Sequence, residues 1–262
     1  MRDAAGKPRV TAGRFYAGTS GWDYPHWKQV LFTGVPRGSW LRHYATRFPA
    51  VEVNATFYHL LPRATFEGWR EQTPASFRFC TKGNRFLTHN KRLKDAAASV
   101  SLERERASGL QDKLAVVLWQ VPRSLKKDLG RLREFAFALG AWPEARHALE
   151  FRDRQWFAPD VAGCLAEHRL AVCQSDAADW PLWDEVTTDL VYVRLHGHEA
   201  TYGSGYGHAA LAAWQSKAAQ WLEQGRDVHV YFDNDALGEA PRDARKLLDL
   251  VAGVPTPHPD AR

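Results

Sequence analysis

Sulfur-containing residues are scarce in this chain of 262 residues, which has three Cys and one Met. No pair among Cys80, Cys164 and Cys173 has CxxC spacing, so the sequence predicts neither a disulfide framework nor a zinc knuckle. Long apolar runs are also absent, because none approaches the ~20 residues that span a bilayer. The polar segment 1–10 lacks the apolar core of a signal peptide. We therefore expect a cytoplasmic protein with reduced thiols and no membrane partner.

A strong excess of charge is missing as well. The formal net charge is +5, which permits a polyanionic partner without requiring one. Aromatic residues, by contrast, are plentiful and include 11 Trp. Such rings fill a core or form stacking walls where a cleft opens, and composition alone does not separate these two uses.

Short apolar runs bounded by turn residues predict eight β-strands. They cover residues 15–19, 50–57, 77–82, 114–120, 147–152, 170–176, 190–196 and 228–233. Apolar residues at helical spacing predict helices at 39–48, 125–139, 209–223 and 241–251, whereas 177–188 is the weakest helix and is also compatible with a loop. Strands that alternate with helices are typical of parallel βαβ units.

Eight such units predict an α/β fold, a (β/α)₈ TIM barrel. An open doubly wound sheet is the alternative, but the Gly18–Gly21 segment is too short for the glycine-rich loop that usually follows its first strand. No repeat or linker interrupts the pattern, so we predict one barrel domain at 15–253. An N-terminal extension (1–14) and a C-terminal tail (254–262) complete the predicted organisation.

Polar side chains gather at the C-terminal ends of the predicted strands, where barrels of this kind carry their sites. The candidate catalytic residues are Glu52, Glu150, Asp176, His196 and Asp233. The candidate substrate-binding residues are Trp22, Tyr24, Trp27, Asn54, Tyr58, Lys82, Arg152, Trp156, Arg194, Tyr202 and Asn234. A charge in a buried parallel strand is costly unless it is paired or faces a wet site, so these residues indicate a shared polar site. The alternative is an internal ion-pair network between the same glutamates and arginines.

Several segments in this order resemble domain-of-unknown-function family 72, the YecE-like proteins. The matching segments run from Gly18-Thr-Ser-Gly-Trp-Asp-Tyr24 through Glu52-Val-Asn-Ala-Thr-Phe-Tyr58, Phe77-Arg-Phe-Cys-Thr-Lys82, Glu150-Phe-Arg152 with Trp156, and Arg194-Leu-His-Gly197 with Tyr202, to Tyr231-Phe-Asp-Asn234. The resemblance implies a TIM-barrel fold but no particular reaction. The family pattern usually has two consecutive Asn where this chain has Asp233 and Asn234.

The first functional hypothesis is binding or hydrolysis of a phosphodiester or nucleic acid, as in endonuclease-IV-like barrels. The three cations of the candidate site, Lys82, Arg152 and Arg194, can hold phosphate oxygens, and its aromatic residues can stack on bases. The carboxylates and His196 can hold a divalent metal ion that activates water. This hypothesis predicts a hydrolase with a phosphate-containing ligand or nucleic acid as its partner.

Two other hypotheses stay open. In the first, Glu52 and Glu150 act as general acid and base on a carbohydrate or sugar phosphate. In the second, the chain is a noncatalytic binding protein on an enzyme-like fold, because a fold does not guarantee activity. The sequence does not determine the oligomeric state.

Overall fold

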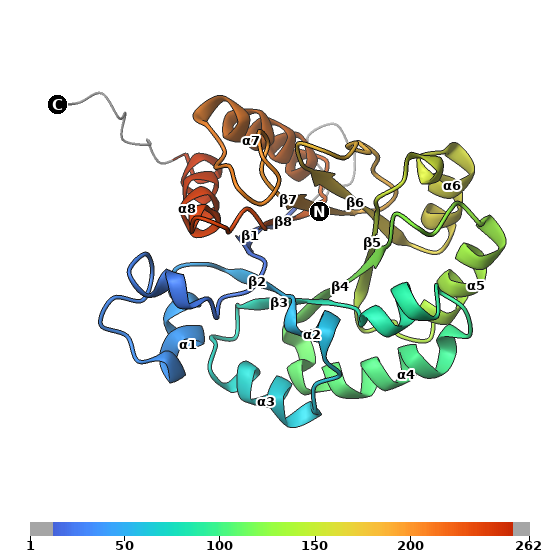
Figure 1. Cartoon of the computed structure of the whole chain (residues 1–262), viewed down its shortest axis with the longest axis horizontal. Helices are drawn as coiled ribbons and strands as arrows, with labels where there is room; N and C mark the ends of the chain where they lie inside the picture. The colour runs from blue at the N-terminus through green and yellow to red at the C-terminus, as the bar shows by residue number, and fades with distance from the viewer. Residues whose placement is uncertain (1–12, 254–262) are drawn as a thin grey trace, which may run out of the picture.

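The computed structural model describes residues 13–253, and in these residues eight parallel strands form a barrel. The strands are β1 (Phe15–Thr19), β2 (Ala50–Val53), β3 (Arg78–Lys82), β4 (Leu114–Val121), β5 (Arg146–Phe151), β6 (Leu170–Asp176), β7 (Leu190–Leu195) and β8 (Asp227–Phe232). They are hydrogen-bonded in the order β1-β8-β7-β6-β5-β4-β3-β2. Figure 1 shows the strands around the centre of the molecule with the helices outside them. The prediction of a (β/α)₈ barrel is therefore confirmed.

Helices follow most of the strands and form the outer layer. They are α1 (Trp40–Tyr44), α2 (Ala55–Tyr58), α3 (Arg63–Glu71), α4 (Ala96–Ala107), α5 (Leu129–Leu139), α6 (Pro159–Glu167), α7 (His208–Glu223) and α8 (Glu239–Val251). The connection 177–189 between β6 and β7 contains no helix. The second strand is shorter than predicted, because Asn54 adopts helical backbone angles and α2 begins at Ala55. The predicted tail and residues 1–12 of the predicted extension lie outside the described residues.

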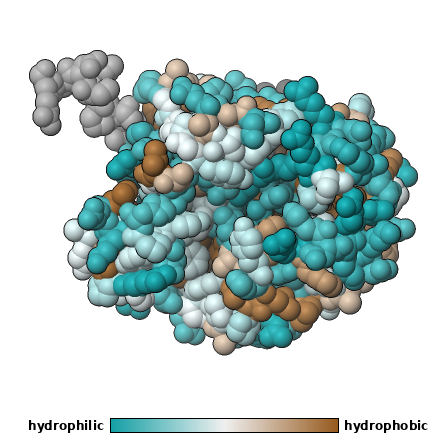
Figure 2. All heavy atoms as spheres, viewed as in Figure 1, coloured by the Kyte–Doolittle hydropathy of each residue, from teal (hydrophilic) through white to brown (hydrophobic). Residues whose placement is uncertain are grey.

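Side chains fill the inside of the barrel in layers. The layer next to the mouth-facing polar one is mainly apolar, and its members include Ala50, Cys80, Leu118, Ala148, Cys173, Tyr192 and Tyr231. Side chains two positions further along these strands point to the same interior, because a strand alternates its faces. Glu52, Lys82, Glu150 and Arg194 follow in this way and form a polar layer nearer the C-terminal ends. The face drawn in Figure 2 is mainly hydrophilic, with hydrophobic residues in small groups.

The barrel closes at the seam between β1 and β2, where one isolated parallel bridge joins Ser20 and Glu52. Tyr44 from α1 fills the seam: its hydroxyl accepts a hydrogen bond from the Thr19 amide at 2.9 Å and donates one to the Ala50 carbonyl at 3.2 Å. A side chain at Gly18 would collide with that carbonyl oxygen, since a Cβ there would lie 2.0 Å from it. The seam therefore depends on a glycine and a tyrosine rather than on a full ladder.

None of the helices within residues 13–253 combines the length and the apolar character needed to cross a membrane.

Candidate active site at the barrel mouth

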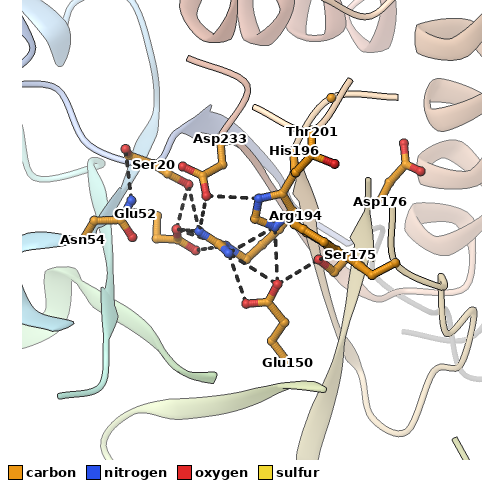
Figure 3. A network of polar contacts seen from close by, with 12 residues as sticks. Ser20, Glu52, Asn54, Glu150, Ser175, Asp176, Arg194, His196, Thr201 and Asp233 are labelled. Carbon is orange, nitrogen blue, oxygen red and sulfur yellow. Dashed lines mark hydrogen bonds and ion pairs between the residues drawn. The ribbon is translucent and has the colours of Figure 1, made fainter. Parts of the chain in front are cut away.

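Arg194 of β7 lies at the centre of the polar layer and is fully buried. Its Nη2 atom lies 2.8 Å from Glu52 Oε1 and 2.9 Å from Asp233 Oδ2, and its Nη1 atom lies 3.1 Å from Glu150 Oε2. Figure 3 shows the guanidinium between these three carboxylates. We call Arg194, Glu52, Glu150 and Asp233 the ionic layer. Strands β2, β5 and β7 supply three of its members, and Asp233 follows β8 directly.

The ionic layer is extended by neutral hydroxyl groups. The Ser20 hydroxyl donates to Glu52 Oε1 at 2.7 Å, and the Tyr192 hydroxyl donates to Glu52 Oε2 at 2.6 Å. The Ser175 hydroxyl donates to Glu150 Oε1 at 2.8 Å. Sequence reasoning missed these residues, although Tyr192 shares its strand face with Arg194 two positions later. Both glutamates are thereby held by an arginine and by hydroxyl groups, as buried charges require.

This arrangement keeps Glu150 and Asp233 ionised. Burial raises the pKa of Glu150, but Arg152 and Arg194 outweigh it and hold that pKa well below its usual value. Burial acts likewise on Asp233, and Arg194 and His196 lower its pKa to about 2. The alternative stated for these residues, an internal ion-pair network, is therefore present in the structure. It also leaves Arg194 with its donors directed at protein groups, and the ligand-contact role predicted for Arg194 stays a prediction.

His196 lies fully buried beside the ionic layer. Its Nε2 atom is 3.1 Å from Arg194 Nη1 and 3.3 Å from Glu150 Oε1. Its Nδ1 atom is 3.1 Å from Asp233 Oδ2, without the geometry of a hydrogen bond. The ring also packs 4.9 Å from Trp180 and 5.5 Å from Tyr202, measured between ring centroids. These contacts hold the imidazole in a fixed orientation.

Lys82, at the end of β3, is the exception among the buried charges. It is 8% exposed, and no ion pair or hydrogen bond from within residues 13–253 holds its ammonium group. Its Nζ atom lies 4.4 Å from the centroid of the Phe57 ring. Burial lowers the pKa of Lys82, the charge of Arg194 adds to this effect, and together they bring the pKa to about 8.

Arg152 follows β5 and stacks on Trp180, with its guanidinium carbon 3.8 Å from the ring centroid. Its Nη2 atom lies 2.7 Å from Glu150 Oε1, while its buried Nε atom has no hydrogen-bond partner within the described residues. The Trp180 indole N–H donates to Ser175 Oγ at 3.1 Å, which fixes the ring. Trp180 was not among the predicted site residues, because it stands in a connection that has neither helical nor strand periodicity.

Three predicted substrate-binding residues are buried away from the mouth. Trp27 is fully buried, and its indole N–H donates to Asp235. Trp156 is fully buried against Phe151, with its indole N–H bonded to a backbone carbonyl. Asn234 is fully buried and donates to Asp243. Core packing or internal hydrogen bonds occupy these three side chains, and the ligand-contact role predicted for them stays a prediction.

Asp176, a predicted catalytic residue, lies apart from the ionic layer. Its Oδ2 atom accepts from the Tyr206 hydroxyl at 3.0 Å and lies 3.4 Å from His198. Figure 3 shows it turned away from Arg194 and without a dashed contact to that network. Asp176 therefore fastens the β7–α7 loop and lies outside the ionic layer, and its catalytic role stays a prediction.

The remaining aromatic and amide candidates lie around the mouth. The Tyr24 hydroxyl and the Asn54 amide both donate to the Ser20 carbonyl, at 2.5 and 3.3 Å. Tyr58 and Tyr202 are exposed, at 60% and 44%.

Trp22 is half-buried, and its ring centroid lies 5.3 Å from that of Trp69. Five predicted residues thus line the mouth or its rim without belonging to the ionic layer.

The residues predicted to hold a divalent metal ion do not fit one. Within residues 13–253, no group of three or more His, Cys, Asp or Glu side chains has an arrangement that could hold a metal. The guanidinium of Arg194 already lies between Glu52, Glu150 and Asp233 and supplies the positive charge that these carboxylates need. The chemistry that we propose for this site therefore uses no metal ion.

These features define a (β/α)₈-barrel protein with one polar site at the C-terminal ends of its strands. A family model described as "Protein of unknown function DUF72" matches residues 16–261, and the chain belongs to this family. The chain is 31% identical to the UPF0759 protein YecE of Escherichia coli K12, over 92% of this chain and 96% of the relative. It is 29% identical to the UPF0759 protein YunF of Bacillus subtilis, over 80% and 86%.

A solved structure agrees with the fold. The crystal structure of a DUF72 family protein from Thermotoga maritima superposes with a TM-score of 0.82 at 24% identity, over 91% of this chain and 99% of the other. The similarity supports the barrel and its topology.

Proposed function

We propose that this protein is an enzyme that uses Lys82 as an amine nucleophile toward the carbonyl group of a small substrate. The observation that carries the proposal is the contrast at the mouth: the carboxylates and Arg194 are paired, whereas the ammonium group of the largely buried Lys82 side chain has no such partner within the described residues. A lysine becomes nucleophilic near neutral pH when it is desolvated or lies near another cation, and both conditions hold for Lys82.

The chemical step needs no further reactant. The neutral amine attacks the carbonyl carbon, and the resulting carbinolamine loses its oxygen as water. Overall, one lysine ammonium and one carbonyl give one protonated imine and one water molecule. The protonated imine withdraws electrons from the neighbouring carbon, which favours proton loss or bond cleavage there.

Reductive labelling tests this proposal. The protein is incubated with a small aldehyde and cyanoborohydride, and the labelled lysines are identified by peptide mass spectrometry. Lys82 should react faster than the exposed Lys94 at neutral pH, with a midpoint near the pKa of about 8. Lys82→Met should remove the fast label, and the matched control Lys94→Met should retain it. Equal labelling rates for the two lysines would contradict the proposal.

Fewer cations are available to support the phosphodiester hypothesis than the sequence suggested. Arg194 directs its donors to protein groups, which leaves Lys82 and Arg152 as candidate phosphate ligands. Binding or hydrolysis of a phosphodiester or nucleic acid stays a prediction, and a steep fall of affinity with salt would favour it.

The paired-carboxylate hypothesis meets an electrostatic difficulty. A general acid must carry a proton at the working pH, yet the arginines hold the pKa of Glu150 well below its usual value. Glu52 and Glu150 also share one guanidinium, so neither is free to approach a glycosidic oxygen. An amine on Lys82 can act on a carbohydrate only where a carbonyl group is available, as in an open-chain sugar.

A further inference from the structure

Positively charged groups collect around one aromatic ring at the mouth. Phe57 of α2 lies 4.4 Å from Lys82 Nζ and 6.0 Å from the guanidinium carbon of Arg85, both measured to the ring centroid. The imidazole of His89 packs edge-on against the same ring, at 5.1 Å between centroids. Three groups that can each donate a hydrogen bond therefore share one wall of the mouth.

Arg152, directly after β5, also acts on His89 through its charge. Burial lowers the pKa of His89, and the charges of Arg85, Lys82 and Arg152 add to this effect and bring it to about 4. His89 is therefore neutral at neutral pH and offers a hydrogen bond without adding charge. We call Lys82, Arg85, His89 and Arg152 the cationic rim.

The cationic rim lacks matching carboxylates. Within the described residues, Glu150 is the carboxylate in contact with Arg152, and Glu150 is shared with Arg194. Lys82 and Arg85 have no ion-pair partner there, and the Arg152 Nε atom is buried without a hydrogen-bond partner. Like charges held together in a partly desolvated place raise the free energy of the empty site, and an anion would lower it.

We propose that the cationic rim binds an anionic group of the substrate, a carboxylate or a phosphate. Planar guanidinium groups suit both, because each presents paired N–H donors. The inference rests on the proposed function for the rest of the substrate: a carbonyl compound with a carboxylate or phosphate near its carbonyl would place the anion on the rim and the carbonyl carbon beside Lys82. Keto acids and sugar phosphates in the open-chain form have this chemistry.

Calorimetric titration with two simple anions tests the rim without any imine chemistry. Inorganic phosphate and malonate serve as probes, because neither has a carbonyl that Lys82 can attack as an imine-forming group. Arg152→Met and the exposed variant Arg85→Met should each weaken binding about tenfold, the loss of one charge-assisted contact. Arg154→Met removes an exposed arginine two positions from Arg152 and should leave the affinity unchanged. Preference for one probe identifies the anionic group.

Two results would overturn the rim proposal: neither probe binds, or Arg85→Met and Arg152→Met both bind as the unchanged protein does. Its failure is distinguishable from failure of the imine proposal. Fast labelling of Lys82 without anion binding refutes the rim alone. Anion binding that depends on Arg85 and Arg152, with slow labelling of Lys82, supports the rim and refutes the amine chemistry.

Discussion

On the β7 side of the mouth, Arg194 is surrounded by three carboxylates and is fully buried. On the β3 side, Lys82 is almost as deeply buried but has no carboxylate within ion-pair distance among residues 13–253. The two cations lie in one layer of one barrel, so the difference is not one of depth. The carboxylates in this layer pair with the arginine, and the lysine has no carboxylate partner among the described residues.

The largest loss of stability should follow from removing the charge of Arg194 on the β7 side of the mouth. Arg194→Met leaves Glu52 buried without its cation and Glu150 with Arg152 alone, and breaking such a buried pair typically costs about 3–5 kcal/mol. Urea denaturation should show this loss at neutral pH. The pKa of Glu150 should rise in the variant, because only Arg152 then offsets burial. Stability should then recover in part as the pH falls. A midpoint equal to that of the unchanged protein would contradict the pairing.

Removing the charge of Lys82 on the β3 side should instead increase the stability of the protein. The pKa of Lys82 is about 8 in the fold against 10.5 as its ordinary value, so the folded state disfavours the charged form. The penalty is fully present below about pH 8 and disappears as the pH rises toward 10.5; its upper bound is on the order of 3 kcal/mol. Lys82→Met should therefore be more stable than the unchanged protein at neutral pH.

Denaturation midpoints measured across this pH window check the prediction. The advantage of Lys82→Met should shrink as the pH rises from 8, since the unchanged protein gains stability there. Lys94→Met, at an exposed position, provides the control and should show no such trend. If Lys82→Met were less stable at every pH, the lysine would be making a favourable contact, and the contrast with Arg194 would be lost.

Substitution of Asp233 should weaken the ionic layer while Arg194 remains in place. Its pKa is about 2 in the fold against 3.8, so it contributes stability above the higher value that is lost as the pH falls between them. Asp233→Asn should cost about 1–2 kcal/mol at neutral pH, with Glu52 and Glu150 still paired to Arg194. Urea midpoints at neutral and acidic pH should converge for the two proteins, and a constant difference would contradict the assigned pairing.

The fold was predictable because its signals are local. The eight apolar runs predicted the barrel, and every strand except the second begins and ends within one residue of its predicted bounds, whereas α3, α4 and α6 were not among the predicted helices. The second strand was the main error among the strands: Thr56 and Phe57 continue the apolar run, but Asn54 turns the chain into α2. Side-chain periodicity does not reveal such a turn, because the backbone angles of one residue decide it.

The site was predictable only in part. Alternation along β2, β5 and β7 correctly placed Glu52, Glu150 and Arg194 in one layer. The sequence does not specify which side chains pair across the barrel. It therefore did not predict that Arg194 is paired with carboxylates and that Lys82 is unpaired. Trp156 shows the same limit, since an aromatic residue after a strand can line a mouth or enter the core, and here it packs on Phe151. These outcomes depend on distances between strands that are far apart in the chain.

The smallest predicted effect is a shift in the pKa of His89, which responds to the charges on the β3 side of the mouth. Its pKa is about 4, lowered by burial and then by Arg85, Lys82 and Arg152. Replacing Arg85 with Met should therefore raise that pKa by about one unit or less, because one repulsion is removed while the burial remains. NMR titration of the imidazole measures this directly. Arg154→Met should leave the titration unchanged, so a shift of equal size in both variants would indicate that His89 senses the overall charge of the protein rather than the neighbouring cations.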